Sequence, residues 1–410
     1  MSMRVRALWM AALVLAAMGN LGCGHYVCKT TFGASTCTAT PGGKGGGGGG
    51  GGTGGGTPTA FAFAGLTSAT GIQSFTFSAT GHSFVATPNV TPATAPTSGG
   101  GSLIVVQGKF LFGTFPGTGL YNQIYGWTIS ATGGLTSISG SPFTVATWTG
   151  TTLGNFTTNP SGSLLFESDP GAVQGQSTVH VFQVGGAGVL TEASGSPLLL
   201  PFSPGTMAMD GLGKYLYVLA VQSGLSGVEI GAYSVGSTGV LTPVSGSPFA
   251  FPMSEVAGDA SGKYLVGTTG GSSGTDAHLY VFSIQQSGTT AGALTAVTGS
   301  PFATLFSPLT IAVQPTGGEF VYSFSLNPTG GNPIEGYQLD TTTGALTKVA
   351  GSPFTSFTAQ RGQFNQTGTF LFGQFGNTLT GYQVPTTGAL ISVARIVEGW
   401  FTQIAIANVP

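Results

Sequence analysis

The chain has 410 residues, of which only 10 are Lys or Arg and 12 are Asp or Glu. The charged fraction of 5% compares with about a quarter in an ordinary soluble domain, which excludes a coiled coil or long surface helices. A net charge of -2 gives no basic surface for nucleic acid, and 41% hydrophobic residues with 28 Phe exclude disorder throughout. With 72 Gly and 23 Pro, the composition predicts an all-β, turn-rich chain.

The N-terminus has the features of an export signal. Arg4 and Arg6 precede an apolar run over residues 7–18, which is too short to span a bilayer and is typical of a signal peptide. The sequence Asn20-Leu21-Gly22-Cys23 then resembles a bacterial lipobox, although Asn20 stands where an aliphatic residue is usual. We therefore expect a signal peptide over 1–22, lipid on Cys23, and a protein anchored in the bacterial cell envelope, facing the periplasm or the exterior. The alternative is ordinary cleavage that leaves Cys23 free.

Two short segments follow the signal. The segment 23–37 contains Cys28 and Cys37, an even pair for which an oxidising compartment makes a disulfide the expected state. A metal site with His25 would lack further ligands, so we expect no metal. The segment 38–57 includes eight consecutive glycines and is predicted to be a flexible linker with a span of about 25 Å.

The remainder, 58–410, is built from one repeated unit. Its marker, Gly-Ser-Pro-Phe or once Gly-Ser-Pro-Leu, recurs every 51 to 55 residues, and each copy follows a Gly-x-Leu sequence. The copies begin at Gly140, Gly195, Gly246, Gly299 and Gly351. A repeat of about 50 residues with a fixed phrase indicates a repeat fold.

Each unit is predicted to contain four short strands. In one copy these are residues 310–313, 320–324, 334–339 and 345–349, each with alternating apolar residues and each bounded by turn residues. Four strands in about 50 residues are typical of a β-propeller blade. The length fits seven blades, and one blade would combine residues 402–407 with residues 61–63, 73–77 and 83–85, which closes the ring and leaves no exposed edge.

The repeated residues have structural explanations. Proline after the outermost strand costs no ladder hydrogen bond, and the Phe is expected to pack between blades. Asp210, Asp259, Asn159 and Asn365 begin the turns between the first two strands, where Asp and Asn bond their own backbone. The two aspartates are therefore poor catalytic candidates.

A family resemblance rests on these units. The sequences Lys-Tyr-Leu-Tyr-Val over 214–218, Gly-Tyr-Gln-Leu-Asp over 336–340 and Gly-Ser-Pro-Phe over 351–354 resemble the seven-bladed β-propeller lactonase family. This family contains 6-phosphogluconolactonase-like and muconate-lactonising-like enzymes and is similar to YVTN surface-layer repeats, to which residues 217–220 come nearest. The resemblance implies a propeller of four antiparallel strands per blade and, as one activity, lactone hydrolysis.

Few charges map to the face where the strand-four-to-one and strand-two-to-three connections meet. Catalytic candidates are Glu255 as general base and Arg361 as the group that polarises a carbonyl. Binding candidates on the same face are listed here: Glu167, Asp169, Asp276 and His278. The alternative is that these are solvated loop charges and that Arg361 pairs with a neighbouring carboxylate.

Two functions remain open. The first is a surface module, expected to be a monomer, that binds a protein or glycan through loops with Trp148 and Trp400. The second is a lactonase acting on an uncharged or weakly charged lactone, since a sugar phosphate would need several cations. Neither function calls for a cofactor or for nucleic acid.

Overall fold

The structure is a computed structural model. It describes residues 26–31, 34–39, 57–66, 72–86, 101–115, 122–145, 147–148, 150, 154–172, 175–221, 229–251, 253–269, 277–316, 319–325, 332–398 and 401–409. The chain divides into two compact units, Met1–Thr53 and Gly54–Pro410. Cys23, the glycine run, Asp276 and Trp400 lie outside the described residues.

The described part of the first unit is a two-stranded hairpin. Strands β1 (Tyr26–Thr31) and β2 (Ala34–Ala39) pair antiparallel, and only two residues separate them. In this register Cys28 is the backbone partner of Cys37. The hairpin therefore brings the two cysteine positions opposite each other.

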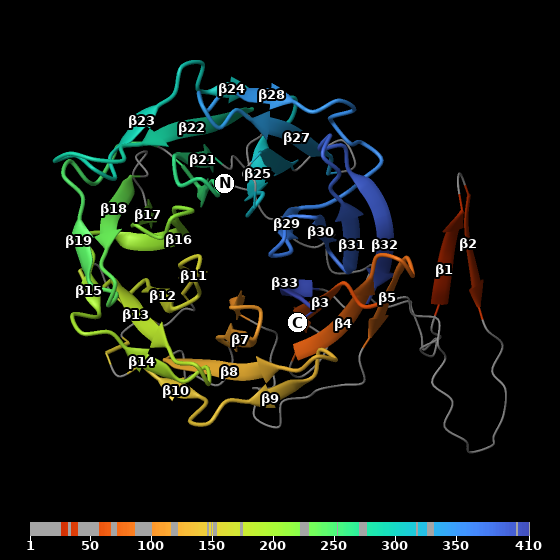
Figure 1. Ribbon diagram of the computed structural model, residues 1–410, viewed down its shortest axis with the longest axis horizontal. Helices are drawn as coiled ribbons and strands as arrows, with labels where there is room; N and C mark the ends of the chain where they lie inside the picture. The colour runs from red at the N-terminus through yellow and green to blue at the C-terminus, as the bar shows by residue number, and fades with distance from the viewer. Residues whose placement is uncertain are drawn as a thin grey trace, which may run out of the picture. The chain divides into compact units, whose positions relative to one another are not determined.

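The second unit is a seven-bladed β-propeller, which confirms the predicted fold (Figure 1). Each blade is an antiparallel sheet whose first strand lies near the central axis. Six blades run in chain order. Blade 1 has β6 (Leu103–Val106), β7 (Phe110–Gly113), β8 (Gln123–Ile129) and β9 (Leu135–Ser137); blade 2 has β11 (Phe156–Thr158), β12 (Leu164–Asp169), β13 (Thr178–Val184) and β14 (Leu190–Glu192); blade 3 has β16 (Ser203–Met209), β17 (Tyr215–Val221), β18 (Ile230–Val235) and β19 (Leu241–Pro243). Blade 4 has β20 (Glu255–Gly258), β21 (Tyr264–Thr268), β22 (His278–Ile284) and β23 (Leu294–Ala296); blade 5 has β25 (Pro308–Val313), β26 (Phe320–Ser325), β27 (Ile334–Leu339) and β28 (Leu346–Lys348); blade 6 has β29 (Arg361–Phe364), β30 (Phe370–Phe375), β31 (Thr378–Gln383) and β32 (Ile391–Val397).

Blade 7 joins the two ends of the propeller segment, as predicted. Its strands are β33 (Phe401–Asn408), β3 (Ala60–Leu66), β4 (Ile72–Ser78) and β5 (Ser83–Ala86), in that order from the inside. The C-terminal β33 pairs with β3 along seven register positions. The ring is closed by this ladder, which leaves β3 paired on both sides, with β33 and β4.

The cores lie between neighbouring blades because side chains alternate along each strand. On β26, Phe320, Tyr322 and Phe324 belong to a cluster with blade 6, whereas Val321 belongs to a cluster with blade 4. Both faces of a second strand are thus buried, which explains its continuous apolar sequence.

The Gly-Ser-Pro phrase clamps five of the seven blades, blades 1 to 5, from outside. In all five copies the Gly has a φ between 83° and 91°, a left-handed conformation that favours glycine, and the Ser-Pro bond is cis. The Ser Oγ accepts a hydrogen bond from a backbone N–H of the third strand. The five donors are Gly126, Val181, Ala232, Val281 and Gly336, at 2.8 to 3.1 Å.

The outer edge differs from the sequence prediction in one respect. The chain does not leave the blade after the phrase, because the next two residues pair again with the third strand. These short strands are β10 (Phe143–Thr144), β15 (Leu198–Leu199) and β24 (Phe302–Ala303). Two blades replace them by a single bridge, Ile230 with Phe249 and Ile334 with Phe354. The fourth strand has only three residues in these blades, so the returning segment covers the rest of the third strand.

The turns after the first strands behave as predicted. Asp210 accepts hydrogen bonds from the backbone N–H groups of Leu212, Lys214 and Tyr215. Asp259 holds the equivalent turn of blade 4 in the same way, and Asn159 and Asn365 each accept one such bond. These side chains shape turns. Within the part of the chain that the structure describes, no helix is long and apolar enough to cross a membrane.

Candidate functional site

The candidate site lies on the face of the propeller where the first strands begin, called the mouth below. A ring of side-chain hydrogen bonds surrounds it, with one bond at each of the seven blade junctions. The bonds run from Ser102 Oγ to Gly154 O, Asn155 Nδ2 to Gly205 O, Thr206 Oγ1 to Ser254 O, Thr268 Oγ1 to Pro308 O, Thr310 Oγ1 to Gln360 O, Gln374 Nε2 to Phe401 O, and Leu103 N to Gln403 Oε1. Their lengths are between 2.7 and 3.4 Å. The start of every first strand is therefore tied to a neighbouring blade.

Glu255 is the first residue of β20 and lies at the mouth end of blade 4. It is half-buried, and burial raises the pKa of its carboxyl to about 7. A backbone N–H of Ile311 and the positive charge of Arg361 act in the opposite direction, but more weakly. A carboxylate with a pKa near neutrality takes up and releases protons at physiological pH, as a general base must.

Arg361 is the first residue of β29 in blade 6, and its side chain is exposed. Blade 5 lies between Arg361 and Glu255, yet the positive charge of Arg361 lowers the pKa of the Glu255 carboxyl. The structure therefore places the two predicted catalytic residues at the same end of their inner strands, with the inner strand of blade 5 between them.

Glu167 and Asp169 occupy a different environment. Both are fully buried on β12 and face blade 1, next to His180 on β13. Burial, together with the charges of Asp169 and Glu192, raises the pKa of Glu167 well above its ordinary value. Neither Glu167 carboxylate oxygen has a hydrogen-bond partner among the described residues. Asp169 accepts hydrogen bonds from the backbone N–H groups of Gly150 and Gly171 and so holds the connection into blade 2.

His180 completes this buried group. Its Nδ1 lies 2.9 Å from Glu192 Oε1 and its Nε2 lies 3.1 Å from Thr178 Oγ1. The ring stacks with those of Trp148 and Phe182. The alternating sequence around His180 indicated a strand face, but the pairing with Glu192 carried no signal in the sequence.

His278, a further predicted binding residue, belongs to blade 4. His278 begins β22 and is half-buried, with its ring 6.5 Å from that of Tyr280. Asp276 lies outside the described residues. Within the described part, no group of three or more His, Cys, Asp or Glu side chains is arranged to hold a metal ion.

Glu335 on β27 is a site-related residue that the sequence did not single out. Its buried carboxylate accepts hydrogen bonds from the backbone N–H groups of Leu305 and Phe306, at 3.0 to 3.1 Å. Tyr337 Oη donates to it at 2.8 Å, and Lys348 Nζ lies 3.1 Å away. Glu335 therefore anchors the connection that leads into β25, the strand that contributes the Ile311 N–H.

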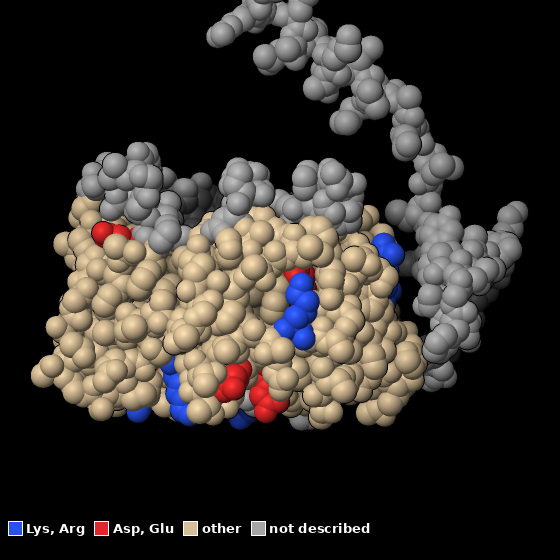
Figure 2. Space-filling view, turned by 90° about the horizontal axis from the view of Figure 1, so that it is seen from above, with Lys and Arg blue, Asp and Glu red and all other residues tan. Residues whose placement is uncertain are grey.

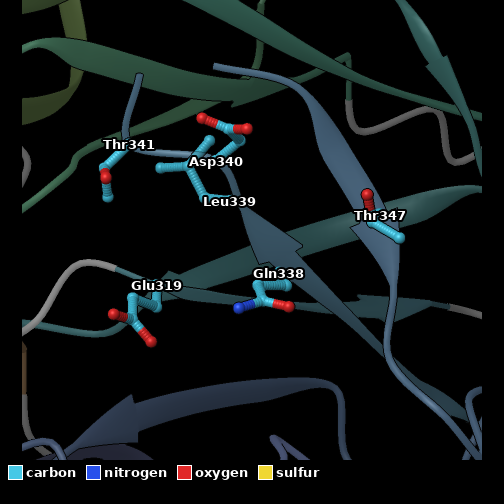
Figure 3. Close-up of a pocket in the computed structure, with 6 residues that line it drawn as sticks. All are labelled: Glu319, Gln338, Leu339, Asp340, Thr341 and Thr347. Atoms are coloured by element: carbon cyan, nitrogen blue, oxygen red, sulfur yellow. The ribbon is translucent and has the colours of Figure 1, made fainter. Parts of the chain in front are cut away.

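A cavity of about 310 Å³ lies at the opposite end of blade 5 (Figure 3). Its lining comes from the turns and strand ends at that end of the blade: Glu319, Gln338, Leu339, Asp340, Thr341 and Thr347. Hydrogen bonds from the backbone N–H groups of Thr342 and Thr343 lower the pKa of Asp340. Asp340 thus serves its turn, and this cavity is distinct from the mouth.

The fold of the second unit, a seven-bladed β-propeller, is shared with known proteins. Three solved structures are similar along most of the chain. A putative 6-phosphogluconolactonase from Bacteroides uniformis has a TM-score of 0.63 and 15% identity, covering 86% of this chain and 100% of that one. The periplasmic gluconolactonase PpgL of Pseudomonas aeruginosa has a TM-score of 0.59 and 16% identity over 86% and 99%. A Lactobacillus plantarum protein has a TM-score of 0.58 and 14% identity over 86% and 99%.

These similarities confirm the resemblance at the level of the fold. Neither a protein-family model nor a curated protein sequence matches the chain.

Proposed function

We propose that this protein hydrolyses an uncharged or weakly charged lactone at the mouth of the propeller. The observation that carries the proposal is the placement of Glu255, whose half-buried carboxyl has a pKa of about 7 and senses the charge of Arg361. Two of the similar structures are those of a gluconolactonase and a putative 6-phosphogluconolactonase. These similarities support the choice of reaction class.

The chemistry needs one base and one positive charge. The Glu255 carboxylate takes a proton from water as the water oxygen attacks the lactone carbonyl carbon. The Arg361 guanidinium stabilises the negative charge that develops on the carbonyl oxygen. Glu255 then returns its proton to the ring oxygen as the C–O bond breaks, which yields the hydroxy acid.

The scarcity of cations favours a neutral substrate. Among the described Lys and Arg residues of the propeller, Arg361 is the one at the mouth. Lys109, Lys214 and Lys263 lie in turns between first and second strands, at the other end of the blades, and Lys348 and Arg395 lie on outermost strands. The side of the propeller also shows large uncharged areas (Figure 2). A phosphate group would find little compensating charge.

The test is a panel of neutral and phosphorylated lactones assayed across pH 5 to 9. We expect turnover of neutral lactones that rises with pH and levels off above about 7, where Glu255 is ionised.

Glu255→Gln should lower kcat by about 10²–10⁴-fold, the usual contribution of a general base. Arg361→Ala should lower kcat and move the rise to higher pH, because the charge that lowers the Glu255 pKa is lost. Glu319→Gln, at the far end of blade 5, serves as the control.

The second candidate is recognition of a neutral glycan or protein by the same face. It is favoured by apolar side chains exposed on the mouth connections, Leu199 at 62% and Leu305 at 60%. A panel without turnover, together with glycan-array binding that is lost on Leu199→Asp and Leu305→Asp, would replace lactone hydrolysis by this function.

The site is proposed to act outside the cytoplasm. The lipobox-like sequence at Cys23 would anchor the chain to a membrane, and the glycine-rich segment would hold the propeller away from it. Cys23→Ser should release the protein from the membrane fraction. Retention of that variant on membranes would contradict the anchor.

A further inference from the structure

Strand β25 lies between the strands that carry Glu255 and Arg361, and it contacts both of those strands. On one side, β25 packs against β20 of blade 4, and the backbone N–H of Ile311 lowers the pKa of the Glu255 carboxyl. On the other side, Thr310 Oγ1 donates to Gln360 O at 2.9 Å, and Gln360 directly precedes Arg361 of blade 6. Two consecutive residues of blade 5 therefore reach the two halves of the site.

A bulge in β25 accompanies this arrangement. The pairing of β25 with β26 shifts between Pro308 and Thr310, so Leu309 is the extra residue. Bulges bend a strand and redirect its side chains and N–H groups, and they are common beside active sites. The bulge lies next to the residues that contact blades 4 and 6.

The base of β25 is fixed from two directions. Thr268 Oγ1 donates to Pro308 O at 2.8 Å, and buried Glu335 holds the preceding connection at Leu305 and Phe306. Because β25 is anchored in this way, its position is fixed, and it fixes the distance between blades 4 and 6.

We propose that β25 sets the separation of Glu255 and Arg361, with Thr310 as the positioning residue for Arg361. This inference rests on the proposed roles of Glu255 and Arg361. Without the Thr310 hydroxyl, the Gln360 carbonyl loses its donor from blade 5, and the backbone that carries Arg361 is then held from within blade 6, where the Gln360 N–H donates to Gln374 O. Among the described groups, Arg361 is the charged side chain that lowers the Glu255 pKa, and the Ile311 N–H is the hydrogen-bond donor that does so.

The experiment measures the titration of the Glu255 carboxyl by ¹³C NMR on protein with labelled glutamate side chains. The Glu255 signal is assigned by its absence in Glu255→Gln. Thr310→Val removes the hydroxyl at nearly constant volume and should raise the Glu255 pKa in the same direction as Arg361→Ala. Thr310→Ser, which keeps a hydroxyl, should restore the original value.

The control is Ser102→Ala, which removes the equivalent bond at the junction of blades 1 and 2. It should leave the Glu255 titration unchanged. In addition, Thr310→Val should cause no further rise in an Arg361→Ala background, because both changes remove the same interaction.

An unchanged Glu255 pKa in Thr310→Val, or an equal rise in Ser102→Ala, would overturn the proposal. Failure of both Thr310→Val and Thr310→Ala to fold would do so too, since the hydroxyl would then serve stability in general. The titration does not depend on turnover. A chain inactive on every lactone that still shows the expected pKa pattern refutes lactone hydrolysis and leaves the positioning role of Thr310 intact.

Discussion

Ser352 Oγ accepts a hydrogen bond from the backbone N–H of Gly336 at 3.0 Å, and so the loop after the outermost strand of blade 5 is clamped to its third strand. The same bond occurs at each of the other four copies of the phrase. Removal of the hydroxyl leaves a backbone donor without its acceptor inside the sheet. Ser352→Ala should lower the free energy of unfolding by about 1–3 kcal/mol. Denaturant unfolding measures this, with Ser237→Ala, in an exposed turn, as the control; equal stability of both variants would contradict the clamp.

Alanine substitutions at Gly344 and Gly288 distinguish two costs of replacing a glycine, the backbone cost at positive φ and the cost of a steric clash. Both have positive φ, 74° and 86°, so a side chain at either position costs about 1–2 kcal/mol in backbone energy. A Cβ at Gly344 would also lie 2.6 Å from Tyr264 Cε1 of the neighbouring blade, whereas a Cβ at Gly288 would meet nothing within 4 Å. Gly344→Ala should therefore cost about 1–3 kcal/mol more than Gly288→Ala, the usual range for overpacking. Equal losses in thermal unfolding would show that the blade contact at Tyr264 yields freely.

Glu167 should make the propeller less stable as pH rises. Its folded-state pKa is raised well above the unfolded value, so the folded protein binds more protons than the unfolded chain in the window between the two. The favourable contribution is complete below the unfolded pKa and is lost as pH rises toward the folded pKa. Glu167→Gln, which stays neutral, should raise the Tm at pH 8 by about 2–4 °C, the shift that about 1 kcal/mol gives, and by less at pH 4.

The matched variant for this experiment is Glu335→Gln, because Glu335 is equally buried but fully hydrogen-bonded. This change should lower the Tm at both pH values. A Glu167→Gln variant whose Tm difference is independent of pH would contradict the raised pKa of Glu167.

Cys28 and Cys37 should form a disulfide when the protein is isolated from an oxidising compartment. The positions flanking a two-residue loop form a hydrogen-bonded pair, and the pairs alternate from there, so Cys28 and Cys37 stand at a non-hydrogen-bonded position. The Cα separation of such a pair, about 4.5 Å, lies within the range that a disulfide requires. Trypsin cuts after Lys29, between the two cysteines. The two peptides should therefore stay linked until reduction in the Cys23→Ser protein, and separate peptides before reduction would contradict the pairing.

The repeat could be predicted because its strands and turns follow from patterns among residues that are close together in the sequence. Alternation, turn residues and the recurring phrase located the four strands of blade 5 to within about two residues, and the match of residues 402–407 to other inner strands indicated the closing blade. The return of the chain to the third strand was missed because a two-residue strand such as Phe302–Ala303 has no periodicity of its own.

The site was predictable only in part. The position of Glu255 and Arg361 follows from their place at the start of inner strands. The burial of Glu167 does not, because a carboxylate after an apolar strand looks the same in sequence whether it faces solvent or a neighbouring blade. The link from Thr310 to Gln360 spans 50 residues and lies beside a bulge, and no sequence pattern indicates either feature.

The seven hydrogen bonds around the mouth link each blade to the next and so hold the inner strands in a ring of fixed size. An outward displacement of one blade would stretch the hydrogen bonds at both of its junctions. Because the ladder of β3 and β33 closes the ring, the strain would be shared by all the blades. The bonds come from Ser, Asn, Thr and Gln, so the requirement at each junction is for reach and a suitable polar group rather than for one residue type. The residues beside a junction can therefore change, and with them the side chains that surround the mouth, while the circumference of the ring stays the same.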